Sequence, residues 1–160
     1  MQIRELADSD LDQVLTLNQG ALEGVGTLDL ERLAWIVGLS DQAIVVDDDG
    51  TIAGFCLIVR PGTAYDSPNY RWFSQRYVDF GYLDRVVVAA SHRRRGVGSM
   101  MYDHVETMAG PLGQMALEVY VDPPNVVSLA FHEARGYAEV GRLLDQANGK
   151  TSTMLLKPLG

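Results

Sequence analysis

Residues 81–101 read GYLDRVVVAASHRRRGVGSMM, and this stretch decides how the chain is interpreted. Val86-Val87-Val88 is a continuous apolar run, typical of a strand that is buried on both faces. The turn Arg93-Arg94-Arg95-Gly96-Val97-Gly98 follows it, and the apolar stripe of a helix begins at Met100. The segment therefore predicts a strand, a glycine-rich turn and a helix, in that order.

Such a turn is suited to hold an anion. The first turn of a helix leaves about four backbone N–H groups without partners, and the helix dipole adds partial positive charge there. Gly96 and Gly98 lack side chains, so phosphate oxygens can approach the backbone closely. The chain has no Gly-Lys-Ser/Thr and no Gly-x-Gly-x-x-Gly, which excludes the P-loop and the dinucleotide fingerprint. The alternative interpretation is an ordinary turn with solvated arginines.

Similar signals predict the other elements of the chain. Apolar runs predict further strands near residues 2–6, 42–46, 51–60, 114–121, 138–144 and 152–157. Apolar residues at helical spacing predict helices near residues 10–22, 27–38, 70–77 and 125–135, with Thr27 as the cap of the second. This order predicts a mixed α/β sheet with helices on both faces, in a single domain that spans residues 1–160.

Composition narrows the classes of partner. The formal net charge is −8, so nucleic acid is not expected as a partner, whereas a cationic substrate such as an amine is favoured. No apolar run is long enough for a membrane span and the start is unlike a signal peptide, so we expect no membrane association and a cytoplasmic location. No metal site is expected. Cys56 is the single cysteine, with a buried core thiol favoured over a reactive one.

Two motifs in register resemble the GNAT superfamily of N-acetyltransferases. Arg93-x-x-Gly96-x-Gly98 is similar to the acetyl-CoA signature of that family, Gln/Arg-x-x-Gly-x-Gly/Ala. Asn125-x-x-Ser128-x-x-Phe131-His132-x-x-x-Gly136-Tyr137 is similar to its second element, Asn-x-x-Ala/Ser-x-x-Phe/Leu-Tyr-x-x-x-Gly-Phe. The segment 65–73 resembles a marker of a bacterial subgroup of predicted acetyltransferases. Together the motifs are much more specific than either one alone.

This resemblance implies a fold and an activity. The fold is a mixed, mostly antiparallel sheet of about seven strands flanked by about four helices. The activity is direct transfer of an acetyl group from acetyl-CoA, as a co-substrate, to a primary amine of a small molecule or peptide. The alternatives are a coenzyme-A-binding sensor or partner module with little catalysis, and a plain α/β interaction domain. The oligomeric state is undecided, with a homodimer left open. The residues implied for coenzyme binding are Val86, Val87, Val88, Arg93, Arg94, Arg95, Gly96, Val97, Gly98, Ser99, Asn125, Ser128 and His132.

Three residues are candidates for a catalytic role, namely His132, Asp84 and Glu118. The usual family tyrosine, thought to protonate the departing thiolate, is replaced by His132, which can also donate a proton or can simply pack. A base must deprotonate the amine, and a carboxylate within an apolar strand suits that role. Asp84 and Glu118 are the candidates, and the alternative for each is an ion pair, for instance with Arg85 or Arg71.

Aromatic residues near the middle of the chain are candidates for the wall of the acceptor site. Tyr65, Tyr70 and Trp72 belong to one segment, and Tyr82 is expected on the same strand face as Asp84 and Val86. The alternative is that the aromatic residues pack in the core. His92 and His104 are expected at the surface.

Overall fold

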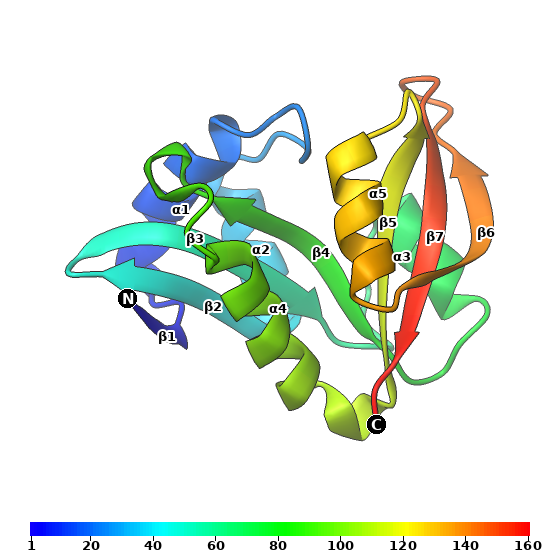
Figure 1. The fold of residues 1–160 in the computed structure, drawn as a ribbon, viewed down its shortest axis with the longest axis horizontal. Helices are drawn as coiled ribbons and strands as arrows, with labels where there is room; N and C mark the ends of the chain where they lie inside the picture. The colour runs from blue at the N-terminus through cyan, green and yellow to red at the C-terminus, as the bar shows by residue number, and fades with distance from the viewer.

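The computed structural model describes residues 1–160 and contains a seven-stranded sheet with helices on both faces (Figure 1). The strands are β1 (Gln2–Glu5), β2 (Ser40–Asp48), β3 (Thr51–Val59), β4 (Gly81–Val88), β5 (Gln114–Asp122), β6 (Ala138–Leu144) and β7 (Thr151–Pro158). The α-helices are α1 (Leu11–Gln19), α2 (Leu30–Leu39), α3 (Pro68–Ser74), α4 (Val97–Met108) and α5 (Val126–Ala134). The sheet order is β1-β2-β3-β4-β5-β7-β6, in which only the β4–β5 pair is parallel.

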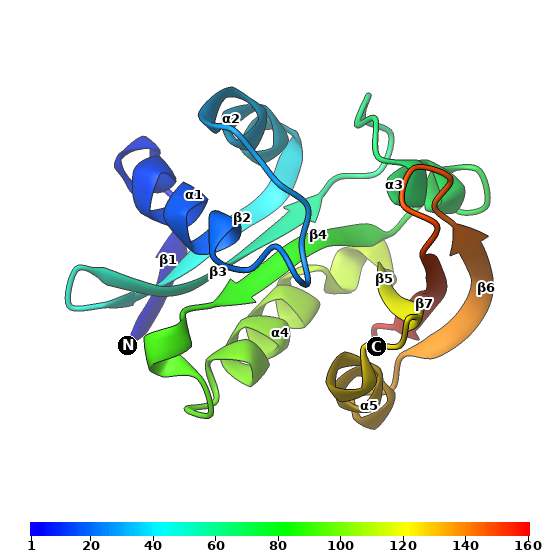
Figure 2. The ribbon, with the colours of Figure 1, turned by 90° about the horizontal axis from the view of Figure 1, so that it is seen from above.

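The expected seven-stranded sheet is therefore confirmed. The helix expected near residues 70–77 is α3, so the structure has five α-helices where the resemblance implied about four. Helices α1, α2 and α3 lie on one face, while α4 and α5 lie on the other (Figure 2). Each face has its own apolar core, one centred on residues such as Leu33 and Phe73 and the other on residues such as Met101 and Met115. No helix combines the length and the apolar character that a membrane crossing requires.

Strands β4 and β5 separate along their length, and this separation positions the functional site. They pair only at Gly81↔Met115 and Tyr82↔Ala116, near the start of both strands. Beyond that point the two ribbons diverge, with α4 beside β4 and α5 beside β5 (Figure 1). The edge of β4 that faces β5 therefore has no strand partner after Tyr82, and its backbone N–H and C=O groups are open.

Three local expectations can be compared with the structure. Asp29, and not Thr27, caps α2, because its carboxylate accepts the backbone N–H of Arg32 at 2.8 Å. His92 was expected at the surface but is buried, with its Nε2 atom 2.8 Å from an Asp48 carboxylate oxygen on the β2–β3 hairpin. Cys56 is fully buried, and burial raises the pKa of its thiol, as expected for a core cysteine.

Helix α4 lies unusually close to the sheet where it crosses β3. A Cβ atom on Gly54 would come within 2.8 Å of the Val87 carbonyl oxygen and 3.0 Å of the Met101 side chain. Glycine at this position thus allows the helix that begins at the anion-suited turn to pack directly over β3 and β4.

Candidate active site

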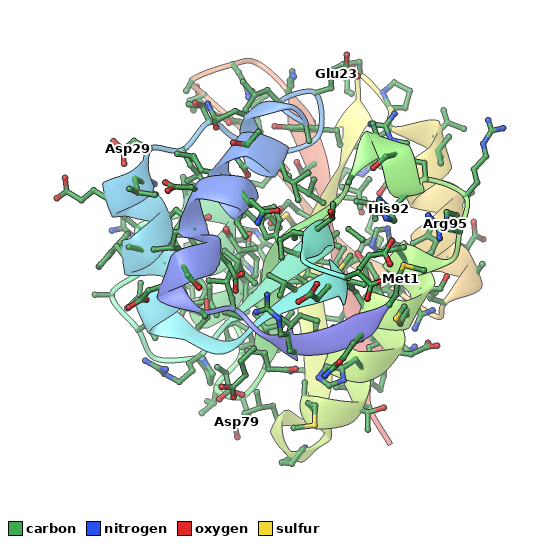
Figure 3. The ribbon with its side chains drawn as sticks, turned by 90° about the vertical axis from the view of Figure 1, so that its left-hand side faces the viewer. Met1, Glu23, Asp29, Asp79, His92 and Arg95 are labelled. Carbon is green, nitrogen blue, oxygen red and sulfur yellow. The ribbon has the colours of Figure 1, made fainter.

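A cleft of about 940 Å³ lies where β4 and β5 separate. Its walls come from β4, β5 and the starts of α4 and α5, and the loop 20–25 covers one end. A smaller hollow of about 280 Å³ lies between loop 22–27 and the β6–β7 loop. The residues that it shares with the cleft are Glu23, Gly24, Val25, Tyr120 and Lys150. In Figure 3, Glu23 lies at the top of the molecule, and His92 and Arg95 lie on the loop that leads into α4.

One end of the cleft borders the glycine-rich turn. No protein group accepts a hydrogen bond from the backbone N–H groups of residues 94–99, although most of the chain's amides are paired. Arg94 and Gly96 have positive φ angles of 62° and 76°, which turns successive N–H groups inward. The resulting concave row of donors at the start of α4 is a binding site suited to phosphate oxygens.

The residues predicted to hold coenzyme divide into two groups. Those that line the cleft are Val86, Val87, Val88, Arg93, Gly98, Asn125, Ser128 and His132. Arg94, Arg95, Gly96, Val97 and Ser99 do not line it, and the Val97 side chain is buried in the core, so these residues can contribute only through their backbone or from the rim. Asn125 also caps α5, because its Oδ1 atom accepts the Ser128 N–H at 3.2 Å.

A β-bulge at Asp84 changes which side chains of β4 share a face. Leu57 of β3 is opposite Arg85 but the next residue, Ile58, is opposite Leu83, so Asp84 is the extra residue. The prediction that Tyr82 and Val86 share one face of the strand was therefore wrong, because the bulge interrupts the alternation of side chains between the two faces. Tyr82 packs in the core beneath α1–α3, whereas Val86 packs against the core beneath α4 and α5.

The Asp84 carboxylate is already occupied by protein partners. Its oxygens accept from the Tyr65 hydroxyl at 2.5 Å and from Arg85 Nε at 2.7 Å, and its side chain is only 5% exposed. Arg85 in turn donates from NH1 to Asn18 Oδ1 at 2.9 Å and to the Gly26 carbonyl at 3.0 Å. The ion pair that was the alternative interpretation of Asp84 is thus present, and it fixes α1 and the loop that follows it.

Glu118 lies across the cleft from this ion pair, on β5. Its carboxylate accepts a hydrogen bond from the Tyr82 hydroxyl and has no basic partner. Burial raises the pKa of Glu118 to about 8, and the nearby negative charge of Asp84 acts in the same direction. Near neutral pH this carboxyl can therefore exchange a proton with a group in the cleft.

His132 is buried between α4 and α5. Its Nδ1 atom is 2.7 Å from the Ser128 carbonyl oxygen, and its Nε2 atom is 2.6 Å from the Tyr102 hydroxyl. Burial lowers the pKa of His132. Tyr102 also lines the cleft but was not predicted from the sequence. Its spacing of four residues from Gly98 was a usable signal, since such residues share a helix face.

The four aromatic residues proposed as an acceptor wall occupy a different place. Tyr65, Tyr70, Trp72 and Tyr82 are all at most 9% exposed, and none lines the cleft. They pack with Phe73 and Phe80 in the core beneath α1–α3, because large rings gain most from removal from water. Two of them still contact residues of the site. The Tyr65 hydroxyl donates to Asp84. The Tyr82 hydroxyl donates to Glu118.

The far end of the cleft lies between two loops. Gly24 and Val25 of the α1–α2 loop line one side, and Lys150 of the β6–β7 loop lines the other. The Lys150 ammonium lies over the ring of Tyr120, 4.9 Å from its centroid. Gly24 is exposed and Val25 and Lys150 are partly exposed, so this end of the cleft borders solvent.

Comparison with known proteins agrees with this geometry. A curated relative, phosphinothricin N-acetyltransferase of Streptomyces viridochromogenes, is 29% identical over 119 residues, which are 72% of this chain and 55% of the relative. The chain thus spans about half the length of that relative.

Solved structures share the fold. The ribosomal-protein-S18-alanine N-acetyltransferase of Escherichia coli superposes with a TM-score of 0.75 at 16% identity, covering 99% of this chain and 94% of that one. Ard1 of Thermoplasma volcanium superposes with a TM-score of 0.78 at 16% identity, covering 99% and 97%. The model of the Acetyltransferase (GNAT) family matches residues 11–137. The chain therefore belongs to the acetyltransferase (GNAT) family.

Proposed function

We propose that the protein transfers the acetyl group of acetyl-CoA directly to a primary amine of an acceptor. The observation that carries this proposal is the cleft between β4 and β5, which has unpaired N–H donors at one end and the Glu118 carboxyl in its wall. The two features match the two requirements of the reaction, which are an anion site for the coenzyme and a base for the amine.

The residues at the turn fit the diphosphate of the coenzyme. The N–H groups of residues 94–99 lack acceptors in the protein, and Arg93 adds positive charge beside them. The open edge of β4 at Val86 and Val88 offers backbone groups to the amides of the coenzyme arm, as the family resemblance implies. When bound, acetyl-CoA supplies an acetyl group activated as a thioester.

Glu118 is the base that the geometry favours. An acceptor amine arrives as an ammonium ion and must lose a proton before its nitrogen can attack a carbonyl carbon. A carboxylate with a pKa of about 8 removes that proton far more effectively than one with an ordinary pKa. Asp84 is less suited, because Arg85 and Tyr65 already engage both of its oxygens.

The acceptor enters between the α1–α2 loop and the β6–β7 loop. The names of two similar proteins indicate the range of acceptors in the family, one being phosphinothricin and the other an alanine of ribosomal protein S18. A small metabolite, an amino acid and a peptide amine are the acceptor classes proposed for this chain. The acidic balance of the chain favours each of them in its cationic form.

The test is release of free thiol from acetyl-CoA in the presence of a panel of primary amines, with mass spectrometry of the amine. Acceptor-dependent thiol release, equal in amount to the acetylated amine, is the expected result. Thermal stabilisation by coenzyme A without turnover on any amine would instead identify a coenzyme-binding sensor. Absence of any stabilisation by coenzyme A would refute the assignment of the cleft, since a ligand of the folded state must raise its apparent stability.

A further inference from the structure

Tyr102 lines the cleft between β4 and β5, and its hydroxyl group is 2.6 Å from Nε2 of His132, the residue that stands in place of the family tyrosine. We propose that Tyr102 is the catalytic residue that stabilises the departing sulfur, and that His132 positions its hydroxyl group. This inference rests on the proposed function. It assigns the role to a residue on α4, one helix away from the motif position that carries the family resemblance.

The contacts of His132 define its tautomer. A backbone carbonyl can only accept a hydrogen bond, so the Nδ1 atom, 2.7 Å from the Ser128 oxygen, carries the ring proton. Because burial lowers the pKa of His132, the ring is neutral near pH 7 and its Nε2 atom is an acceptor. The Tyr102 hydroxyl, 2.6 Å away, therefore donates to Nε2. The histidine is held in the wrong state to act as an acid itself.

The Tyr102 ring is fixed by its surroundings, and the residue lines the cleft. Edge-on aromatic contacts join it to Phe131, His132 and Tyr137, with centroid distances of 5.1, 5.3 and 6.3 Å. Tyr102 lines the cleft together with Gly98, four residues earlier on α4. The ring is immobilised and only rotation of the O–H bond is free, which is the arrangement expected of a preorganised donor.

The hydroxyl can change its acceptor as the reaction proceeds. In the bound thioester the sulfur is a poor acceptor, so the O–H bond points to Nε2 of His132. As the amine nitrogen bonds to the acetyl carbon, the C–S bond breaks and its electron pair stays on sulfur. The O–H then turns toward the thiolate, which is a stronger acceptor than imidazole. Glu118 takes the ammonium proton before the attack and passes it to solvent, and the second nitrogen proton leaves to solvent once the bond to the acetyl carbon has formed. The thiolate is protonated from solvent, and Tyr102 keeps its own proton. Such a contact is gained only in the transition state, so it raises kcat.

The first test replaces the hydroxyl by hydrogen. Tyr102→Phe is expected to lower kcat by about 10- to 100-fold and to leave the KM for acetyl-CoA within about twofold. Tyr137→Phe is the matched control. Tyr137 packs against the same rings, but its hydroxyl donates to Glu106 at 2.8 Å and it does not line the cleft. Its kcat is expected to stay within about twofold. Unchanged kcat in Tyr102→Phe, or equal losses in both variants, would overturn the assignment.

A second test separates positioning from packing at His132. His132→Phe keeps a ring but removes the acceptor for the Tyr102 hydroxyl, whereas His132→Gln loses the ring and retains an amide oxygen that can accept. If His132 positions the hydroxyl, the glutamine variant has the higher kcat. If the ring only packs, the phenylalanine variant is the more active and the proposal fails. A wild-type protein that acetylates no amine would instead refute the proposed function, so the two failures are distinguishable.

Discussion

Replacement of Glu118 by glutamine is expected to have opposite effects on activity and on stability. Glutamine retains an oxygen that accepts from the Tyr82 hydroxyl, so the local packing is preserved. It cannot take a proton from an amine, and loss of a general base costs roughly 10²- to 10⁴-fold in rate. With a weakly basic acceptor amine, the kcat of the wild type is expected to rise with pH up to about 8, the pKa of Glu118. The kcat of Glu118→Gln is expected to be low and nearly independent of pH.

The sign of the stability effect follows from the same pKa. Between pH 4.5 and about 8 the unfolded chain releases the Glu118 proton while the folded chain retains it. The free energy of unfolding of the wild type therefore falls as pH rises through this window, and glutamine avoids the loss. The full pKa difference corresponds to an upper limit of about 5 kcal/mol. Because the carboxyl borders an open cleft, we expect about 2 kcal/mol at pH 8.5, or a rise in Tm of about 4–8 °C.

Thermal melts of the wild type and of Glu118→Gln from pH 5 to 8.5 measure the change in stability, and pH–rate profiles measure the change in kcat. Glu106→Gln is the matched control with the opposite sign. Glu106 does not line the cleft, and although burial opposes ionisation, its hydrogen bonds from Arg135, Lys157 and Tyr137 lower its pKa. Its stabilising contribution is therefore present above pH 4.5 and is lost on acidification, so that variant is expected to melt lower at pH 7. A Glu118→Gln variant that is less stable at pH 8.5 than at pH 5, relative to wild type, would show that the pKa of Glu118 is not raised in the folded chain.

Three further substitutions test other parts of the site and the fold. Gly98→Asp fits the fold, because the nearest neighbour of the added Cβ is a Val88 methyl group 3.9 Å away. The new carboxylate is expected to repel the diphosphate and to weaken coenzyme A binding at least tenfold in calorimetry. Gly98→Ala adds no charge and is expected to weaken binding less. Arg85→Met leaves Asp84 buried without its ion pair and is expected to lower the free energy of unfolding in urea by about 3–5 kcal/mol. Replacement of an exposed arginine is expected to lower it less. Gly141→Ala places a Cβ against the Trp72 ring and is expected to lower the free energy of unfolding by about 1–3 kcal/mol in the same measurement. Coenzyme binding unaffected by the aspartate, or wild-type stability in either of the other two variants, would contradict the respective account.

The order of elements could be predicted from the sequence because apolar periodicity and turn residues are local signals. The strand expected at residues 81–89 is β4 (Gly81–Val88), and the helix expected to open at Asn125 is α5 (Val126–Ala134). The separation of β4 from β5 could not be predicted from local signals of this kind. It depends on which distant residues pair, and only Gly81 and Tyr82 of β4 do so with β5. No periodicity within a single strand contains that information.

Details of the site were harder to predict for the same reason. The bulge at Asp84 depends on the register with β3, so alternation along β4 placed Tyr82 on the wrong face. An aromatic residue such as Trp72 is equally suited to a core and to the wall of a substrate site. Only tertiary packing, which buries Trp72, distinguishes the two roles. Tyr102 could not be identified in the same way, because the apolar stripe of α4 does not show which residue of the helix reaches a cleft between two distant strands.

A crystal structure of the protein with coenzyme A bound would show whether the cleft between β4 and β5 is the coenzyme site. We expect the diphosphate to lie against the backbone N–H groups of residues 94–99 and the arm to follow the open edge of β4. The sulfur should then lie in the cleft beside the Tyr102 hydroxyl, on the side of Glu118. A diphosphate bound elsewhere, or a sulfur outside the space between β4 and β5, would contradict the account.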